Sequence, residues 1–329
     1  MSTNALEPTS PADTGPGVSF ALPADFNRRK LANLGAGGVF FLAAASSILI
    51  TVGIVAILFY ESSHFFAEAS LVEFFTGTEW DPTRAWPGED GYRADYPPKF
   101  GILPLICGTL VTTVVALAIA LPMGTIIAVY LSEFAPFWVR ELVKPMLELL
   151  SAVPTVVFGY FALLFVSPLL ATILPGLPLF NMLSAGLVMG IMIIPYVSSL
   201  SEDALRSVPM LLREGSYGLG ANRIQTATKV VFPAALSGIA AAYVLGISRA
   251  IGETMIVAIA AGQQPKVTLN PLESGETVTA FIARVSAGDV GHTGPGFYSI
   301  FGAGIVLFAM TLGFNILGHY LRKRYRQSY

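Results

Sequence analysis

Six long apolar stretches divide this sequence and decide what it can fold into. Their approximate bounds are Ala36–Phe59, Ile102–Leu131, Met146–Val166, Ser184–Leu200, Ala234–Ala261 and Phe297–Leu321. About twenty apolar residues are enough for a helix to cross the hydrocarbon core of a bilayer. Only 12% of the residues are charged, whereas soluble domains usually contain about a quarter. We therefore predict an all-α polytopic membrane protein with six transmembrane helices.

The N-terminal region predicts a tail followed by an uncleaved anchor. Residues 1–30 are rich in Pro, Ser, Thr and Ala at first and end in Arg28, Arg29 and Lys30, so we expect a disordered tail. The apolar stretch that follows is longer than the roughly 7–15 residues of a signal peptide. Residues 31–60 are therefore expected to form a membrane anchor helix.

The distribution of positive charge predicts the orientation. Six spans place both termini on one side, and the segments on that side carry thirteen of the 19 lysine and arginine residues. They are Arg28, Arg29, Lys30, Arg140, Lys144, Arg206, Arg213, Arg223, Lys229, Arg322, Lys323, Arg324 and Arg326. The other side carries Arg84, Arg93, Lys99, Lys266 and Arg284. Because cytoplasmic loops are enriched in Lys and Arg, we expect both termini to lie in the cytoplasm.

The segments between the spans follow from this orientation. We expect an external loop over residues 61–99, a transport core over 100–321 and a cytoplasmic tail over 322–329. Within the core, residues 203–233 form a cytoplasmic loop and residues 262–296 an external one. Residues 132–144 read as a polar linker and 167–183 as a loop or re-entrant turn. One helical face holds Val278, Phe281, Ile282 and Val285, which predicts a short helix on the outer surface.

The positions of glycine and proline in the cytoplasmic loop predict two short helices. Pro209 suits the first position of a helix, and Gly220 suits a helix exit with positive φ. Asn222 and Gln225 have the spacing of a capping box for a second helix. Pro233 then suits the start of the next membrane helix. From these residues alone, a plain connector and a docking element for a partner are about equally plausible.

The same loop resembles the EAA signature of ABC importer permeases. That signature reads Glu-Ala-Ala, three residues, Gly, nine residues, Ile, one residue, then Leu-Pro. The spacing is matched in full, with Glu214, Gly220 and Pro233 identical to the signature. Gly215 and Ser216 replace the two alanines, and Val230 and Phe232 replace Ile and Leu. In that family the loop docks into a groove on a separate ATPase subunit. The resemblance implies that Glu214, Gly215, Ser216, Gly220 and Pro233 couple the chain to such an ATPase.

Two charged residues lie inside the fifth span. An arginine at the centre of a span costs about 2.5–3.5 kcal/mol on insertion scales, so Arg249 needs a reason to be there. Glu253 is four residues later, but the Arg-then-Glu order is the weaker one for helix support. The alternatives are a neutralised pair within the bundle and a substrate pathway, and intramembrane charges favour the second. A guanidinium suits an oxyanion, and Ser248 and Thr254 add hydroxyl groups nearby.

The sequence around this pair resembles the permease of phosphate-specific ABC importers, in its PstC-type form. The resemblance rests on ISRAIGETMIV (Ile247–Val257), LSAVPTVVFGY (Leu150–Tyr160) and FGILPLICGTLVTT (Phe100–Thr113) and covers about residues 99–320. It implies a type I (MetI-like) importer fold in the plasma membrane, inorganic phosphate as cargo, and a role for Arg249 and Glu253 in its passage. We add Ser248 and Thr254 to the expected pathway because their hydroxyl groups are next to this pair in the sequence. The resemblance also implies a PstA-type partner permease, a PstB-type ATPase dimer and an external PstS-type binding protein, with no cofactor.

Other functions remain open at this point. The same machine would suit sulfate, molybdate or an amino acid, and an ATPase-independent secondary transporter or channel is the alternative from another class. No Walker A, HExxH or GxSxG motif occurs, so neither ATP binding through a P-loop nor intramembrane hydrolysis is expected. Cys107 is the single cysteine, and His64, His292 and His319 are too scattered in sequence to indicate a metal site. We therefore expect a transport subunit that is not itself an enzyme.

Overall fold

The computed structural model describes residues 26–82, 98–289 and 294–324, and residues 1–25, 83–97, 290–293 and 325–329 fall outside this description. Most of the predicted N-terminal tail, part of the first external loop and His292 are among the latter. The chain divides into two units, residues 1–56 and 57–329. In the first unit the helix α1 (Phe26–Glu68) begins. Apolar side chains on this part of α1, such as Phe40 and Leu49, are each 73% exposed, as a lipid-facing anchor requires.

The second unit is a bundle of long helices. Its long helices are α3 (Leu103–Val129), α7 (Met182–Arg206), α10 (Phe232–Ile251) and α13 (Pro295–Arg324). The shorter ones are α2 (Leu71–Thr76), α4 (Phe137–Ala152), α5 (Thr155–Phe161), α6 (Ser167–Ile173), α8 (Met210–Gly218), α9 (Arg223–Thr226), α11 (Met255–Ala260) and α12 (Val278–Arg284). Four π-helical turns of the described chain extend or join them: η2 (Tyr130–Phe134), η3 (Ala162–Val166), η4 (Ala227–Val231) and η5 (Val285–Asp289). The described residues contain six helices long and apolar enough to span a membrane, as predicted.

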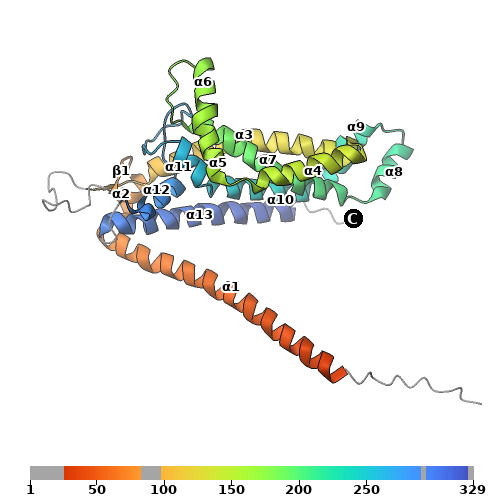
Figure 1. Ribbon diagram of the computed structural model, residues 1–329, viewed down its shortest axis with the longest axis horizontal. Helices are drawn as coiled ribbons and strands as arrows, with labels where there is room; N and C mark the ends of the chain where they lie inside the picture. The colour runs from red at the N-terminus through yellow and green to blue at the C-terminus, as the bar shows by residue number, and fades with distance from the viewer. Residues whose placement is uncertain (1–25, 83–97, 290–293, 325–329) are drawn as a thin grey trace, which may run out of the picture. The chain divides into compact units, whose positions relative to one another are not determined.

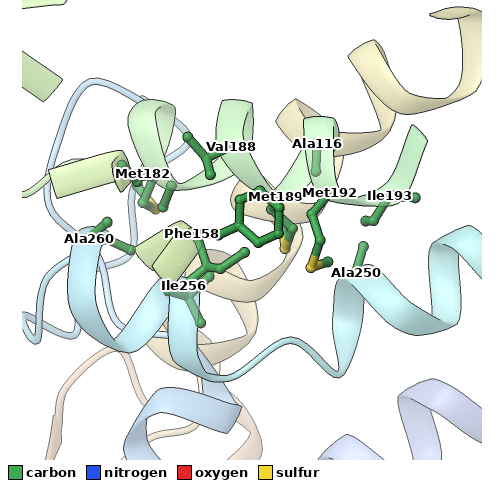
Figure 2. Close-up of a cluster of buried hydrophobic side chains, with 14 of the residues drawn as sticks. Ala116, Phe158, Met182, Val188, Met189, Met192, Ile193, Ala250, Ile256 and Ala260 are labelled. Carbon is green, nitrogen blue, oxygen red and sulfur yellow. The ribbon is translucent and has the colours of Figure 1, made fainter. Parts of the chain in front are cut away.

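Helix α7 is the centre of the bundle. It packs along α3 and α10, and α10 also packs against α13. Figure 2 shows Met189, Met192 and Ile193 of α7 close to Phe158 and Ala250, in a cluster whose side chains are almost all apolar. Such a cluster needs close shape matching, because lipid tails are as apolar as the core.

Gly186 and Gly190 allow the close approach of α7 and α3. A Cβ on Gly186 would lie 2.7 Å from the Cβ of Val115, and one on Gly190 would lie 2.8 Å from the carbonyl oxygen of Ala116. The GxxxG pair therefore packs helices within this subunit.

Replacing Gly186 with alanine should lower the thermal stability of the permease. The new methyl group overlaps the side chain of Val115, and overpacking of this kind costs about 1–3 kcal/mol. Gly313 on α13 is the matched control, since a Cβ there meets nothing within 4 Å. Thermal unfolding of the two purified variants in detergent measures the difference. An unchanged melting temperature for Gly186→Ala would show that the α3–α7 contact can relax.

The two ends of the bundle carry different elements. Figure 1 shows α8 and α9 at one end of the second unit, and α2, β1, α11 and α12 at the other. The strands β1 (Trp80–Asp81) and β2 (Lys99–Phe100) pair antiparallel, with Trp80 opposite Phe100. The loops predicted for opposite sides of the membrane therefore lie at opposite ends of the bundle.

Several predicted boundaries were wrong, and proline explains two of them. The third span does not begin at Met146, because helix α4 ends at Ala152 and a new helix starts after Pro154. A residue before proline avoids the helical conformation. The expected loop over residues 167–183 begins as α6, since Pro168 occupies the first turn of that helix, where a missing N–H costs nothing. The expected polar linker over 132–144 is partly helical, with α4 starting at Phe137.

The short helix predicted on the outer surface is instead buried. Val278, Phe281 and Val285 are 0% exposed, and Ala280 on the adjoining face is 2% exposed. The predicted apolar face is thus correct, but α12 inserts among α3, α11 and α13. Thr109 of α3 helps to hold it there, because its hydroxyl accepts a hydrogen bond from the amide of Val278 at 3.0 Å.

Candidate functional site

The fifth span is interrupted where the predicted site lies. Helix α10 ends at Ile251, α11 begins at Met255, and Gly252, Glu253 and Thr254 link them. The prediction of one helix over residues 234–261 was therefore wrong. Figure 2 shows this non-helical link between Ala250 and Ile256. The break places Arg249 and Glu253 on different elements, so their sequence spacing no longer makes them neighbours on one helix face.

Glu253 holds the start of α11. Its side chain is only 8% exposed, and its Oε1 accepts hydrogen bonds from the amides of Met255 at 3.1 Å and Ile256 at 3.3 Å. A carboxylate at this place is favoured by the free amides and the positive end of the helix dipole. Its own carbonyl oxygen accepts a hydrogen bond from the Thr279 hydroxyl at 2.6 Å. Glu253 thus ties α10, α11 and α12 together.

The side chain of Arg249 makes no ion pair and no hydrogen bond with the part of the chain that the structure describes. Its guanidinium carbon lies 4.0 Å from the centre of the Tyr196 ring on α7, and its buried Nε has no hydrogen-bond partner. The ring quadrupole attracts the cation but accepts none of its in-plane N–H bonds. The alternative of a neutralised Arg249–Glu253 pair is therefore not found in the structure, where Arg249 makes a cation–π contact with Tyr196 instead.

The two predicted hydroxyl groups are engaged elsewhere. Ser248 donates a hydrogen bond to Oδ1 of Asn315 on α13 at 3.3 Å. Thr254 donates to the carbonyl oxygen of Gly252 at 3.4 Å, within the link itself. The structure therefore places both residues beside Arg249 and Glu253 in the chain, without a contact to the guanidinium.

The predicted coupling loop forms a compact projection from α8 to α9. Gly220 joins them with φ = 85°, and Asn222 and Gln225 form the predicted capping box. The hydroxyl groups of Ser216 and Thr226 lie 2.9 Å apart and fix the two helices to each other. Pro209 caps α8 from outside rather than beginning it. Pro233 lies within the first two residues of α10, as expected.

The second short helix of this projection is part of the fifth span. Residues Arg223–Ile251 form one helix of 29 residues, because η4 joins α9 to α10. The prediction of a separate second helix was wrong in this respect. From Arg223 to Arg249 this helix is about 39 Å long at 1.5 Å per residue, so a single element reaches from the projection to the stacked arginine.

The outer surface of the projection combines polar and apolar groups. Glu214 and Gly215 are exposed, and a Cβ on Gly215 would meet nothing within 4 Å. Leu211 and Leu219 are 78% and 91% exposed. Exposed apolar side chains next to polar ones are typical of a protein–protein interface.

Sequence reasoning missed a buried ion pair that seats this projection. Arg213 of α8 bonds Glu133 of η2 at 3.0 Å, with side chains 12% and 7% exposed. Arg213 also donates to the carbonyl oxygens of Leu205 at 2.9 Å and Val208 at 2.5 Å. The lone acidic residue that ends the second span was the available signal, but its partner is 80 residues away in sequence.

A cationic cluster at the same end was also missed. Glu202 of α7 is 1% exposed and lies within 4 Å of three cations, Arg140 at 3.9 Å, Lys144 at 3.6 Å and Arg206 at 3.6 Å. Glu202 and Lys144 line a cavity of about 280 Å³ together with Glu148, Ser151, Tyr196 and Ser199. Tyr196 therefore belongs both to this cavity and to the contact with Arg249.

A second cavity lies at the end of the bundle that holds α11. Its volume is about 660 Å³, and Phe180, Gln263, Lys266 and Glu273 are among its lining residues. Lys266 donates a hydrogen bond to Glu273 at 3.1 Å. This bond and the positive charge of Lys266 lower the pKa of Glu273 below its usual value.

Comparison with known proteins agrees with this architecture. A family model described as "Binding-protein-dependent transport system inner membrane component" matches residues 120–327. The probable ABC transporter permease protein YqgH of Bacillus subtilis (strain 168) is 34% identical over 86% of this chain and 86% of its own. The phosphate transport system permease protein PstC of Xylella fastidiosa (strain 9a5c) is 32% identical over 77% of this chain and 79% of its own.

Two solved structures share the fold at low identity. One belongs to a bacterial alginate ABC transporter in complex with an alginate pentasaccharide-bound periplasmic protein, with a TM-score of 0.60, 16% identity, and coverage of 90% of this chain and 98% of that chain. The other is from the inward-facing MetNI methionine ABC transporter, with a TM-score of 0.51, 16% identity, and coverage of 69% and 95%. Both support the predicted type I importer fold. The chain belongs to the family of inner membrane components of binding-protein-dependent transport systems, and is a multi-pass ABC transporter permease rather than an enzyme.

Proposed function

We propose that this permease translocates inorganic phosphate delivered by an external binding protein. The observation that carries the proposal is the guanidinium of Arg249, which has no ion pair or hydrogen bond within the described chain. Its carbon lies 4.0 Å from the centre of the Tyr196 ring, and its Nε has no hydrogen-bond partner. A planar fork of free N–H donors suits a tetrahedral oxyanion, which it can bind through two oxygens at once.

The neighbouring residues support the arrangement in different ways. Glu253 fixes the end of α10 by capping α11, which keeps Arg249 at the edge of a helix break. Ser248 and Thr254 have hydroxyl groups beside the break and would have to exchange their present weak partners to reach an anion. We propose a pathway formed by Arg249, Glu253, Ser248 and Thr254, with Arg249 as the residue that contacts the cargo.

The energy for transport would come from a separate ATPase. The projection from Glu214 to Pro233 has an exposed apolar surface and a fixed internal geometry, and we propose that it docks into the ATPase subunit. Glu214, Gly215, Ser216, Gly220 and Pro233 belong to this coupling element. The excess of Lys and Arg at this end supports an orientation with the projection and both termini in the cytoplasm.

The assembled importer would contain four kinds of subunit. We propose a heterodimer with a related PstA-type permease, a PstB-type ATPase dimer and an external PstS-type phosphate-binding protein. Two named relatives differ in what their descriptions specify: PstC of X. fastidiosa is a phosphate permease, whereas YqgH of B. subtilis is described as a probable ABC permease. The phosphate relative supports the choice of cargo.

The test is the anion that stimulates ATP hydrolysis. The complex, reconstituted in proteoliposomes with its binding protein, should hydrolyse ATP faster with phosphate but not with sulfate, molybdate or an amino acid. The direct measurement is the rate of ATP hydrolysis, together with uptake of radiolabelled phosphate. Stimulation by sulfate or molybdate alone would assign another oxyanion to the same machine. Uptake that continues without ATP would instead indicate a secondary transporter or channel.

A further inference from the structure

In the part of the chain that the structure describes, the guanidinium of Arg249 makes a cation–π contact with Tyr196. The ring and the guanidinium carbon are 4.0 Å apart, and both residues are half-buried within the bundle. We propose that Tyr196 is a positioning residue for anion transport: it keeps Arg249 in place without using its N–H donors, and it separates Arg249 from the cavity beside Lys144. This inference rests on the proposed transport of an oxyanion.

The chemistry of the contact explains why a ring is better suited than a carboxylate. A carboxylate would accept two N–H bonds from the guanidinium, and the cargo would have to compete with it. An aromatic face attracts the cation through its quadrupole and leaves the in-plane donors unused. The unpartnered Nε of Arg249 is the result expected of such a contact. A buried donor without a partner is costly, so an incoming oxyanion gains from satisfying it.

The Tyr196 ring is itself fixed by its surroundings. Its hydroxyl donates a hydrogen bond to the carbonyl oxygen of Ser151 at 3.2 Å, one residue before the end of α4. On α7 the neighbours Pro195 and Val197 are buried. Tyr196 therefore connects α7, α4 and α10 at one point, and a movement of any of these helices would change the contact with Arg249.

The cavity gives the ring a second role. Tyr196 lines the cavity of about 280 Å³, whereas Arg249 is not among its lining residues. Lys144 in the cavity wall lies 3.6 Å from Glu202 and 3.4 Å from Asp203, so a cation is already present beyond the ring. Tyr196 thus contacts Arg249 and also shares the lining of this cavity with Lys144, so we place it on the path of an anion that moves from Arg249 toward Lys144.

The test compares three tyrosine variants in the reconstituted complex. Tyr196→Phe keeps the ring but loses the bond to Ser151, and Tyr196→Leu loses the ring. Tyr320→Leu on α13, where the side chain is 58% exposed, is the matched control. We expect phosphate uptake to fall about tenfold or more in Tyr196→Leu, since the cation–π contact is lost. Uptake should remain near the original rate in Tyr196→Phe and Tyr320→Leu.

A second readout does not depend on the cargo. A membrane-permeant dicarbonyl reagent such as phenylglyoxal modifies arginine, and mass spectrometry of the peptide that contains Arg249 gives the rate. This rate should rise severalfold in Tyr196→Leu and stay unchanged in Tyr196→Phe. Equal rates in all variants, or a phenylalanine variant as defective in uptake as the leucine variant, would overturn the assignment. If the unaltered complex fails to respond to phosphate, the proposed cargo fails, while the modification rates still decide the role of Tyr196.

Discussion

Replacing Arg249 with glutamine is expected to reduce phosphate uptake at least a hundredfold while the complex assembles normally. Each hydrogen bond from a charged group contributes about 1.5–3 kcal/mol, so the loss of two such bonds removes about two orders of magnitude or more. Stability should not suffer. Arg249 has no ion pair to lose within the described chain, and an arginine in a span costs about 2.5–3.5 kcal/mol. Uptake in proteoliposomes and thermal unfolding measure the two effects separately.

Two controls distinguish loss of the anion contact from loss of positive charge. Arg249→Lys keeps the charge but replaces the planar fork with a point charge, so we expect partial activity between the two extremes. Lys266→Gln removes a cation outside the spans, where Lys266 is 52% exposed, and should transport normally. Normal uptake by Arg249→Gln would exclude Arg249 from the pathway. A folding defect in that variant would contradict the account of its energetic cost.

The sequence was sufficient to predict the membrane architecture because length and apolarity determine it. A helix needs about 17–25 predominantly apolar residues to cross the hydrocarbon core, and the sequence contains six apolar stretches of at least that length, although the third helix begins later than Met146. The cap at Asn222 and Gln225 and the turn at Gly220 were also predictable, because they depend only on neighbours within a few residues. The contact of Gly186 with Val115, by contrast, joins residues that are far apart in the sequence.

The site depended on contacts that are distant in sequence. Arg249 and Glu253 were paired by their spacing, but that argument assumes an unbroken helix, and α10 ends at Ile251. Glu253 lies in the break itself, and its carboxylate caps α11, the helix that follows. Tyr196 could not be recognised as the partner of Arg249, because it is on α7, a different span from the one that holds Arg249. The burial of α12 likewise depends on Thr109, 169 residues away from Val278.

The ion pair between Arg213 and Glu133 determines how the proposed ATPase-docking projection is seated. Arg213→Ala would leave the carboxylate of Glu133, 7% exposed, without its cation. Breaking one side of a buried pair destabilises a protein by about 3–5 kcal/mol. Helix α8 would also lose one bond to the carbonyl oxygen of Leu205 in α7 and one to that of Val208 in the link between α7 and α8. We therefore expect a lower melting temperature and a loss of most of the ATPase that co-purifies with the permease.

A double variant distinguishes two effects of the ion pair: holding α8 in place and presenting a charge to the ATPase. Glu133→Leu combined with Arg213→Met removes both charges, and apolar replacement of a buried pair is often neutral or stabilising. We expect this variant to recover most of the stability and part of the ATPase binding that Arg213→Ala loses. If ATPase binding stays lost while the melting temperature recovers, Arg213 acts on the partner directly. If Arg213→Ala binds the ATPase normally, α8 is held by the contact between Ser216 and Thr226 and by the helix that continues to Arg249.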